Sequence, residues 1–279
     1  MTLTAHRFLN AGPGGISAEE EARFFASIRL ANGVFKTTDT QRMTALDRLI
    51  ADRAAADGLA EPEVLDVGVS SGVTTLELRD ALKAAALRPR IVALDAAVEA
   101  RLLDVAPGRR VLQDSSGRDL QYEILGVAMR PWRRRLDYVT GYWLLADAAR
   151  ALCVPGKTAA KRRLRLISPG VQAAPEIDIM EDDLSRPLDG LARRFDIVRA
   201  ANLLNLDYFD PAELTRMIKI VRGYMKDAGS LLIVNRTHHD GGNHGTIFKA
   251  EAAGGLTIIE RVGNGSEVES LVLSSHPHR

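Results

Sequence analysis

Residues 63–76 read Glu63-Val64-Leu65-Asp66-Val67-Gly68-Val69-Ser70-Ser71-Gly72-Val73-Thr74-Thr75-Leu76, and this stretch decides the fold. A short apolar run passes into a turn of small residues and then into a segment whose apolar positions recur at helical spacing. Small residues between a buried strand and a helix leave backbone N–H groups beside a groove, which suits a ligand that lies close to the main chain. The stretch therefore predicts a nucleotide-type site at a strand-to-helix turn.

The spacing of the glycines favours one kind of nucleotide. A dinucleotide site needs G-x-G-x-x-G, whereas this turn has only Gly68 and Gly72, with Ser70 between them and Asp66 ahead. An acid at the strand end repels a pyrophosphate and attracts an ammonium group. The pattern resembles motif I of the class I S-adenosylmethionine-dependent methyltransferases, Asp/Glu-x-Gly-x-Gly-x-Gly, with Ser70 at the middle glycine. An ordinary strand-to-helix turn of an α/β domain is the alternative.

Length and composition limit the class of protein. The 279 residues suit one α/β domain with additions, and 46% hydrophobic with 26% charged residues is typical of a globular protein with a core. A net charge of +1 gives no global field that points to nucleic acid or membrane. One cysteine, Cys153, excludes an internal disulfide, and the chain shows no signal-peptide pattern and no apolar run long enough to span a bilayer. We expect a cytoplasmic, bacterial protein.

Two helices are predicted ahead of the turn. Ser17-Ala18-Glu19-Glu20 is typical of a helix cap and opens a helix to about Leu30; a second helix is expected from Thr38 or Asp39 to about Ala56. In the methyltransferases that the chain resembles, such helices often form a lid over cofactor and substrate. We expect residues 1–60 to form a helical lid, or simply to cover the sheet, and residues 61–279 to form the methyltransferase domain.

Acidic residues follow two further predicted strands. The strand at 90–95 ends in Asp95, followed by Ala96, and a carboxylate there can accept both ribose hydroxyls. The strand near 177–184 ends in Asp182 and Asp183; the resemblance implies that Asp182 hydrogen-bonds the adenine amino group, while Asp66 and the glycine turn face the methionine part. The cofactor-binding residues expected in all are Asp66, Val67, Gly68, Val69, Ser70, Gly72, Asp95, Ala96, Asp182, Asp183, Ala200 and Asn202.

The order of the later segments completes the resemblance. A strand is expected within 194–205, a helix from Asp210 and Pro211, an apolar strand after Gly229, and a terminal antiparallel pair at 256–262 and 267–273. The resemblance covers 63–95 and 176–273. It implies an α/β, Rossmann-like three-layer sandwich around a seven-stranded, mostly parallel sheet with an antiparallel C-terminal strand.

Residues 97–175 are too long for the minimal pattern and are expected as an inserted hairpin and helical segment. A hairpin is predicted at 110–125 and helices at 131–153. Between residues 130 and 165 ten Lys or Arg stand against two Asp, interleaved with aromatic residues. This suits peripheral contact with an anionic membrane or an anionic amphiphilic substrate, and less well nucleic-acid phosphates. A helical hairpin with a buried aromatic face and a solvated basic one is the alternative.

A sulfonium activates its own methyl group, so transfer needs an in-line approach, desolvation and sometimes a base, and we expect no metal. The loop at 235–245 holds three histidines that suit a general base, or a metal site, or only a solvated turn. The catalytic candidates are His238, His239 and Tyr208. The substrate-contact candidates are Asn205, Trp132, Tyr138, Tyr142, Trp143 and His244.

The sequence thus predicts a methyltransferase that uses S-adenosyl-L-methionine on a small-molecule or lipid acceptor. Two rival classes stay open. An NAD(P)-dependent oxidoreductase shares the turn and Asp95 but requires G-x-G-x-x-G. A non-catalytic module that binds a membrane or a partner through 130–165 also fits, because motif I is altered.

Overall fold

The computed structural model describes residues 2–12, 14–30, 33, 35, 36, 40–156, 159–238 and 241–275. Its contacts divide the chain into two compact units: unit 1 comprises residues 1–39 and 97–173, and unit 2 comprises residues 40–96 and 174–279. The N-terminal segment and the expected insertion therefore share one unit. The predicted boundary at residue 60 lies instead near residue 40, because the helix at 44–56 belongs with unit 2.

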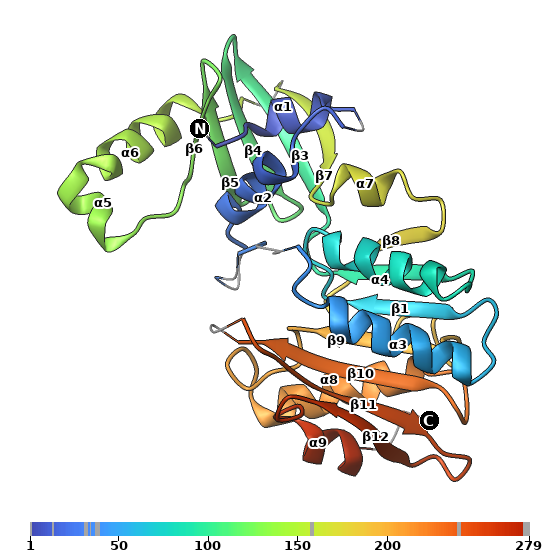
Figure 1. Cartoon of the computed structure of the whole chain (residues 1–279). Coiled ribbons are helices and arrows are strands. Elements are labelled where there is room, and N and C mark those ends of the chain that lie inside the picture. Colours follow the sequence, from blue (N-terminus) through green and yellow to red (C-terminus); the bar gives the residue numbers. More distant parts are fainter. Residues whose placement is uncertain are drawn as a thin grey trace. The chain divides into compact units, whose positions relative to one another are not determined.

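Unit 2 is built on a seven-stranded sheet (Figure 1). The strands at one side of the sheet are all parallel, in the order β10-β9-β1-β2-β8, and β11 is antiparallel to both β10 and β12. The strands are β1 Glu63–Val67, β2 Arg90–Asp95, β8 Ile177–Glu181, β9 Ile197–Ala201, β10 Leu231–Thr237, β11 Asn243–Ala250 and β12 Leu256–Val262. The predicted α/β class, with a mostly parallel seven-stranded sheet, is confirmed.

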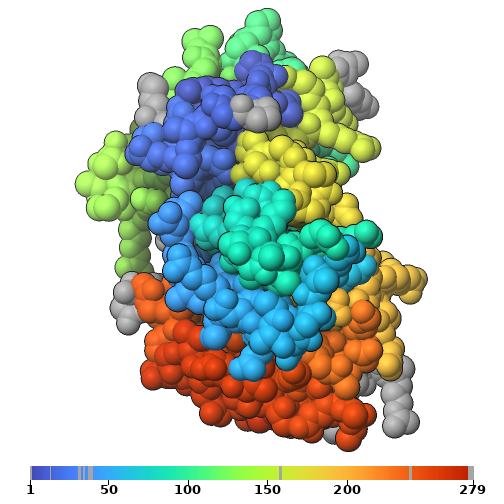
Figure 2. Space-filling view, turned by 45° about the vertical axis from the view of Figure 1, so that its right-hand side comes forward, coloured from blue at the N-terminus to red at the C-terminus, as the bar shows by residue number. Residues whose placement is uncertain are grey.

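Helices cover both faces of this sheet. Side chains of β9 alternate between the faces: Val198 and Ala200 join the apolar cluster of α8 (Pro211–Tyr224), while Arg199 contacts α3 and α4. Helices α3 (Thr44–Ala56) and α4 (Val73–Ala84) lie side by side (Figure 2). Helix α9 (Glu269–Ser274) contributes Val272 to the cluster of α8. The result is the expected three-layer sandwich.

The C-terminal antiparallel pair differs from the prediction. β12 matches the expected strand at 256–262, but its partner is β11, and most of the segment 267–273 is helix α9. Val268 and Val272 are both fully buried and stand four residues apart, which is a helical period. The predicted loop at 235–245 is shorter than expected, because its two ends are paired residues of β10 and β11.

Unit 1 holds a separate five-stranded antiparallel sheet in the order β6-β5-β4-β3-β7. Its strands are β3 Glu99–Ala106, β4 Arg109–Asp114, β5 Asp119–Ile124, β6 Val127–Met129 and β7 Ala160–Arg165. Its helices are α1 Ala5–Asn10, α2 Ala18–Ser27, α5 Arg135–Thr140, α6 Tyr142–Leu152 and α7 Pro169–Gln172.

The insertion is therefore more than a hairpin and helices. The predicted hairpin is the β4–β5 pair and the predicted helices are α5 and α6, but the interior strand β3, between β4 and β7, was not expected. β3 pairs with β7, which lies about sixty residues further along the chain, so its partner is not visible locally. On one face of β3, Ala100 and Leu102 pack with α1 and α2, and on the other face Leu103 packs with α6.

Among the residues that the structure describes, no helix is both long enough and apolar enough to cross a bilayer.

Candidate functional site

The candidate site lies in unit 2, where the parallel strands β1, β2, β9 and β10 end at one edge of the sheet. Open α/β sheets bind ligands outside the carboxyl ends of their strands. The loops that leave this edge carry Gly68–Gly72 after β1, Asp95 at the end of β2, and Asn202 after β9. Three of the sequence-predicted groups therefore meet at one edge.

The glycine loop turns sharply between β1 and α4. Gly68, Ser70 and Gly72 have φ angles of 74°, 56° and 82°, the left-handed region that glycine adopts readily and serine does not. The Ser70 N–H donates to Asp95 Oδ2 at 2.8 Å, and the Gly68 N–H donates to the Leu94 carbonyl at 2.7 Å. These bonds hold the loop over the end of β2 and place the Asp95 carboxylate against its backbone.

Gly68 has a second reason to be glycine. A Cβ built on Gly68 would lie 3.1 Å from Cβ of Leu203, in the loop after β9. The sequence suggested that this glycine makes room for a ligand near the main chain. In the structure the space beside Gly68 is filled by Leu203.

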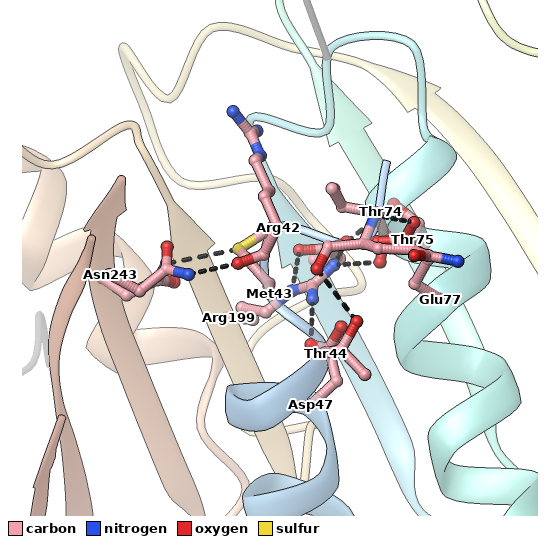
Figure 3. A network of polar contacts seen from close by, with 12 residues as sticks. Arg42, Met43, Thr44, Asp47, Thr74, Thr75, Glu77, Arg199 and Asn243 are labelled. Carbon is pink, nitrogen blue, oxygen red and sulfur yellow. Dashed lines mark hydrogen bonds and ion pairs between the residues drawn. The ribbon is translucent and has the colours of Figure 1, made fainter. Parts of the chain in front are cut away.

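Arg199 is the charged residue that sequence reasoning missed. It lies in the middle of β9 and is wholly buried. Its Nε donates to Asp66 Oδ1 at 2.9 Å and its Nη2 to Asp66 Oδ2 at 2.6 Å, while Nη1 donates to Asp47 Oδ1 at 2.7 Å (Figure 3). A guanidinium in an otherwise apolar buried strand requires buried acids. The position of Arg199 among the apolar residues Ile197, Val198 and Ala200 was therefore the sequence signal for this cluster.

This cluster changes the expected role of Asp66. Its carboxylate is buried, and besides Arg199 it accepts a hydrogen bond from Thr75 Oγ1 at 2.7 Å. We expected Asp66 to face the methionine part of the cofactor. Instead its oxygens are used by Arg199 and Thr75, which ties β1 to β9 and to the first turn of α4.

The two carboxylates that contact Arg199 are not equally compensated by its charge. Desolvation by burial raises the pKa of Asp47 to about 6, against the opposing attraction of Arg199. Asp47 Oδ2 is buried without a hydrogen-bond partner among the described residues. Burial works against the charge of Arg199, but Asp66 and Asp47 outweigh it and raise the pKa of Arg199. One guanidinium serves two carboxylates, and Asp47 is the less well compensated.

The segment just before α3 also lies at this edge. The Gln41 N–H donates to Glu77 Oε1 of α4 at 2.6 Å, and Asn243 Nδ2 of β11 donates to the Arg42 carbonyl. The segment thereby bridges α4 and β11, and the Arg42 side chain points away from the Arg199 cluster (Figure 3). Residues 40–43 therefore lie beside the candidate site as a turn ahead of α3, whereas the sequence predicted that the helix would already begin at Thr38 or Asp39.

Several buried polar atoms near this edge have no hydrogen-bond partner among the described residues, and Ser71 Oγ, Asn202 Nδ2 and Asn235 Oδ1 are among them. The other amide atoms are engaged: Asn202 Oδ1 accepts from the Thr237 N–H at 2.6 Å, and Asn235 Nδ2 contacts Met43 Sδ at 3.3 Å. Buried polar atoms are usually paired. A set with both donors and acceptors suits a polar ligand.

The acids after β8 are held by their own turn. Asp182 Oδ1 accepts from the Leu184 N–H at 2.8 Å, and Asp183 Oδ1 accepts from the Ser185 N–H at 2.9 Å. The hydrogen bonds to Ser185 lower the pKa of Asp183. The Asp182 N–H donates to the Asp95 carbonyl at 3.0 Å, so the turn adjoins the end of β2.

The remaining residues that the sequence predicted for the cofactor differ in their exposure. Val67 and Ala200 are buried in the cluster that packs against α8, and Val69 is also buried. Their side chains have no access to a polar ligand, so only their backbone is available to one. Ala96, beside Asp95, is exposed.

The catalytic candidates His238 and Tyr208 lie in loops of unit 2. His238 is exposed, and its ring centre lies 4.6 Å from that of His244, whose Nδ1 accepts from the Asn264 N–H at 3.1 Å. Tyr208 is 53% exposed in the loop after β9. His239 lies outside the described residues.

Asn205 has a role different from the one expected. It is buried; its Oδ1 accepts from the N–H groups of Asp207 and Tyr208, and its Nδ2 donates to the carbonyls of Asn202 and Leu203, all at 3.2 Å. Its amide is thus consumed within its own loop. Asn205 shapes the loop after β9, and a direct contact to an acceptor is not expected from it.

The aromatic candidates belong to unit 1. The Arg130 guanidinium lies over the rings of Trp132 and Tyr142, 4.4 and 4.3 Å from their centres. Trp143 is half-buried and Tyr138 is exposed. Trp132 and Tyr142 thus hold Arg130 in place, and Tyr138 remains accessible.

Among the residues described, no group of three or more His, Cys, Asp or Glu side chains is placed to hold a metal ion.

No protein-family model and no curated protein matches this sequence. Solved structures that it resembles include CalS10, a SAM-bound amino pentose methyltransferase from Micromonospora echinaspora (12% identity, TM-score 0.34, 75% of this chain) and a SAM-dependent methyltransferase from Aquifex aeolicus (12%, 0.33, 71%). The DszA carbon methyltransferase is a third (13%, 0.36, 72%). The chain spans 63%, 68% and 38% of the length of these three chains, respectively. Similarity this weak does not identify a function.

Proposed function

We propose that this chain is a methyltransferase that binds S-adenosyl-L-methionine at the carboxyl edge of the unit 2 sheet. The observation that carries the proposal is the hydrogen bond from the Ser70 N–H to Asp95. It holds a carboxylate at the end of β2, against a loop of backbone amides at the end of β1. A carboxylate offers acceptors for both hydroxyls of a ribose.

The unpaired atoms support this cofactor over a dinucleotide. The amino-acid end of S-adenosylmethionine carries an ammonium, which donates hydrogen bonds, and a carboxylate, which accepts them. Asn202 Nδ2 is matched to the carboxylate, and Asn235 Oδ1 is matched to the ammonium. A pyrophosphate only accepts hydrogen bonds and has no use for Asn235 Oδ1. The loop also lacks the third glycine of a dinucleotide site.

The bound cofactor supplies a methyl group that its sulfonium already activates. The residues of the chain then have to bind the cofactor, orient it toward the acceptor and exclude water. The Asn202 amide orients the ligand from the end of β9, and the 40–43 segment walls the edge between α4 and β11.

We infer that the acceptor is a small or amphiphilic molecule, with a lipid as the leading candidate, that His238 receives its proton, and that the Tyr208 hydroxyl contacts it by a hydrogen bond. Both side chains are exposed, on the loops after β10 and β9. A neutral imidazole accepts a proton near neutral pH.

Calorimetric titration with S-adenosylmethionine, S-adenosylhomocysteine and NADPH tests the cofactor. We expect both sulfur compounds to bind and NADPH not to bind. Asp95→Ala should weaken binding at least tenfold, while Asp189→Asn, an exposed acid on the loop between β8 and β9, should leave it unchanged. NADPH binding alone would favour the reductase class, and no binding at all would favour the non-catalytic module.

A second variant separates ligand contact from folding. Asn202→Asp keeps the oxygen that accepts from Thr237 but removes the Nδ2 donor. We expect S-adenosylmethionine affinity to fall at least tenfold with no loss of thermal stability. Unchanged affinity in this variant would remove Asn202 from the binding site.

A further inference from the structure

Helix α6 has two apolar faces, separated on one side by Asp147 and Arg150, and only one of the two apolar faces is covered. Ala149 and Cys153, at its C-terminal end, pack against β3, β4 and β5 in unit 1. The opposite face is exposed and carries no charge over two turns. Its residues are Leu144, Leu145, Ala148, Ala151 and Leu152. An exposed apolar face of this kind marks an interaction site, so this face calls for a partner.

The exposed apolar surface continues onto α5. Leu136 and Val139 lie three residues apart on α5 and are 71% and 85% exposed. Gly141, in the left-handed conformation, joins α5 directly to α6. We name the exposed side chains of Leu136, Val139, Leu144, Leu145 and Leu152 the α5–α6 surface.

The charges beside this surface are basic. The only acids between residues 130 and 154 are Asp137 and Asp147, which pair with Arg130 and Arg133. Arg134 and Arg135, at the start of α5, and Arg150 on α6 add three positive charges that those acids do not neutralise.

The sheet adds further positive charge on the side where α6 packs. Arg101 of β3 lies directly opposite Arg163 of β7, and Lys161 lies opposite Leu103, which contacts α6 in the same cluster. All three basic side chains are exposed, and the structure shows no ion pair between any of them and a described residue. Like charges directly opposite in a sheet are destabilising, so an anionic partner would relieve this arrangement.

We propose that the α5–α6 surface docks on an anionic membrane. Exposed leucine and valine side chains on short helices suit the boundary between headgroups and acyl chains, and the flanking arginines suit anionic headgroups. Charge complementarity favours this partner over a second copy of the chain, because two such surfaces facing each other would oppose their own arginines. The proposal goes beyond the methyl transfer inferred for unit 2 and does not depend on it.

Vesicle co-sedimentation of the full chain tests the proposal without any cofactor. The probes are vesicles of phosphatidylcholine alone and of phosphatidylcholine mixed with phosphatidylglycerol. We expect binding to the mixed vesicles only, weakening as salt is raised. Leu144→Glu with Leu145→Glu, and separately Arg134→Glu with Arg135→Glu, should each reduce binding at least tenfold.

Matched controls lie in unit 2. Leu273→Glu replaces an exposed leucine of α9, and Arg216→Glu replaces an exposed arginine of α8. Both should bind vesicles like the wild type. Circular dichroism melts of all four variants establish that they are folded, and every side chain replaced is exposed.

Three outcomes would overturn the proposal: no binding of the wild type to mixed vesicles, equal binding by the α5–α6 and control variants, or a wild-type dimer that ignores vesicles and that Leu144→Glu with Leu145→Glu converts to a monomer. The last result, read by light scattering, would assign the surface to a second copy. None of these outcomes bears on S-adenosylmethionine binding.

Discussion

Arg199 of β9 and Asp66 of β1 are direct cross-strand partners joined by two hydrogen bonds, and both side chains are buried. The pair links the strand that carries the glycine loop to its neighbour in the sheet. Asp47 of α3 and Thr75 of α4 complete the contact, so one buried guanidinium holds together two strands and two helices. Asp66 acts in this framework as a structural residue of the site.

Removing the guanidinium should destabilise unit 2 strongly. Arg199→Met leaves two buried carboxylates without their partner, and breaking a buried ion pair in this way costs about 3 to 5 kcal/mol. Urea unfolding measures the loss. Arg222→Met is the control, since Arg222 is also buried but bonds to carbonyl and hydroxyl groups, and it should cost less. Equal losses in the two variants would contradict the structural role of the ion pairs.

Asp47 should make stability depend on pH. Its pKa is raised from 3.8 to about 6 in the folded protein, mainly by desolvation, so the folded state binds this proton more tightly than the unfolded chain. The stabilisation that the folded state gains by binding this proton is therefore complete below about pH 4 and is lost as the pH rises to about 6. The change amounts to about 3 kcal/mol.

Comparison with Asp47→Asn isolates that contribution. Asparagine keeps an oxygen for Arg199 but has no charge to desolvate. The free energy of unfolding of the wild type, minus that of the variant, should decrease between pH 4 and pH 6 and be constant above. A difference that is flat over this range would show that Asp47 is charged throughout.

Gly68 should tolerate substitution less well than a glycine with the same backbone conformation in open space. Gly68→Ala meets both a positive φ and Leu203 at 3.1 Å, whereas Gly190→Ala meets a φ of 83° with no atom within 4 Å. The left-handed conformation alone costs about 1 to 2 kcal/mol. We expect Gly190→Ala to lose that amount in thermal or urea unfolding, and Gly68→Ala to lose more.

A second substitution tests the cause. Leu203→Gly removes the Cβ that an alanine at position 68 would contact. In a chain that carries Leu203→Gly, the loss of stability caused by Gly68→Ala should approach the loss caused by Gly190→Ala. If the loss is unchanged, Leu203 does not explain the need for glycine.

Cys153 should be unreactive in the folded protein. It is buried at the end of α6, and burial raises the pKa of its thiol. Ellman's reagent should modify it at least a hundredfold more slowly in the native state than in urea. Rapid native-state labelling would show that the end of α6 opens away from the unit 1 sheet.

Much of unit 2 follows from local sequence signals. The strand and helix around Gly68–Gly72, the strand ending at Asp95 and the Asp210 cap of α8 are where the sequence predicts them. Each is specified within a few residues, by a run of apolar side chains, a positive-φ glycine or a capping side chain that bonds its own helix. The Ser17 cap of α2 in unit 1 is local in the same way.

Other features depended on residues distant in the chain. The sequence from Glu267 to Leu273 suits a strand or a helix, and burial of Val268 and Val272 against α8 selects the helix. β3 is an interior strand of the unit 1 sheet, and not an edge strand, because β7 pairs with it.

The sequence by itself determined that unit 2 is an α/β sheet with a glycine turn and an acid at the end of its second strand, since those patterns are local. Only the tertiary structure decided which polar side chains are paired within the fold. Asp66 is bonded to Arg199, and Asn205 to its own loop, while one polar atom each of Asn202 and Asn235 has no hydrogen-bond partner among the residues that the structure describes. The physical reason is that a polar group's availability depends on which partners the fold brings within hydrogen-bond distance, and the most consequential of these partners lie more than a hundred residues away in the chain.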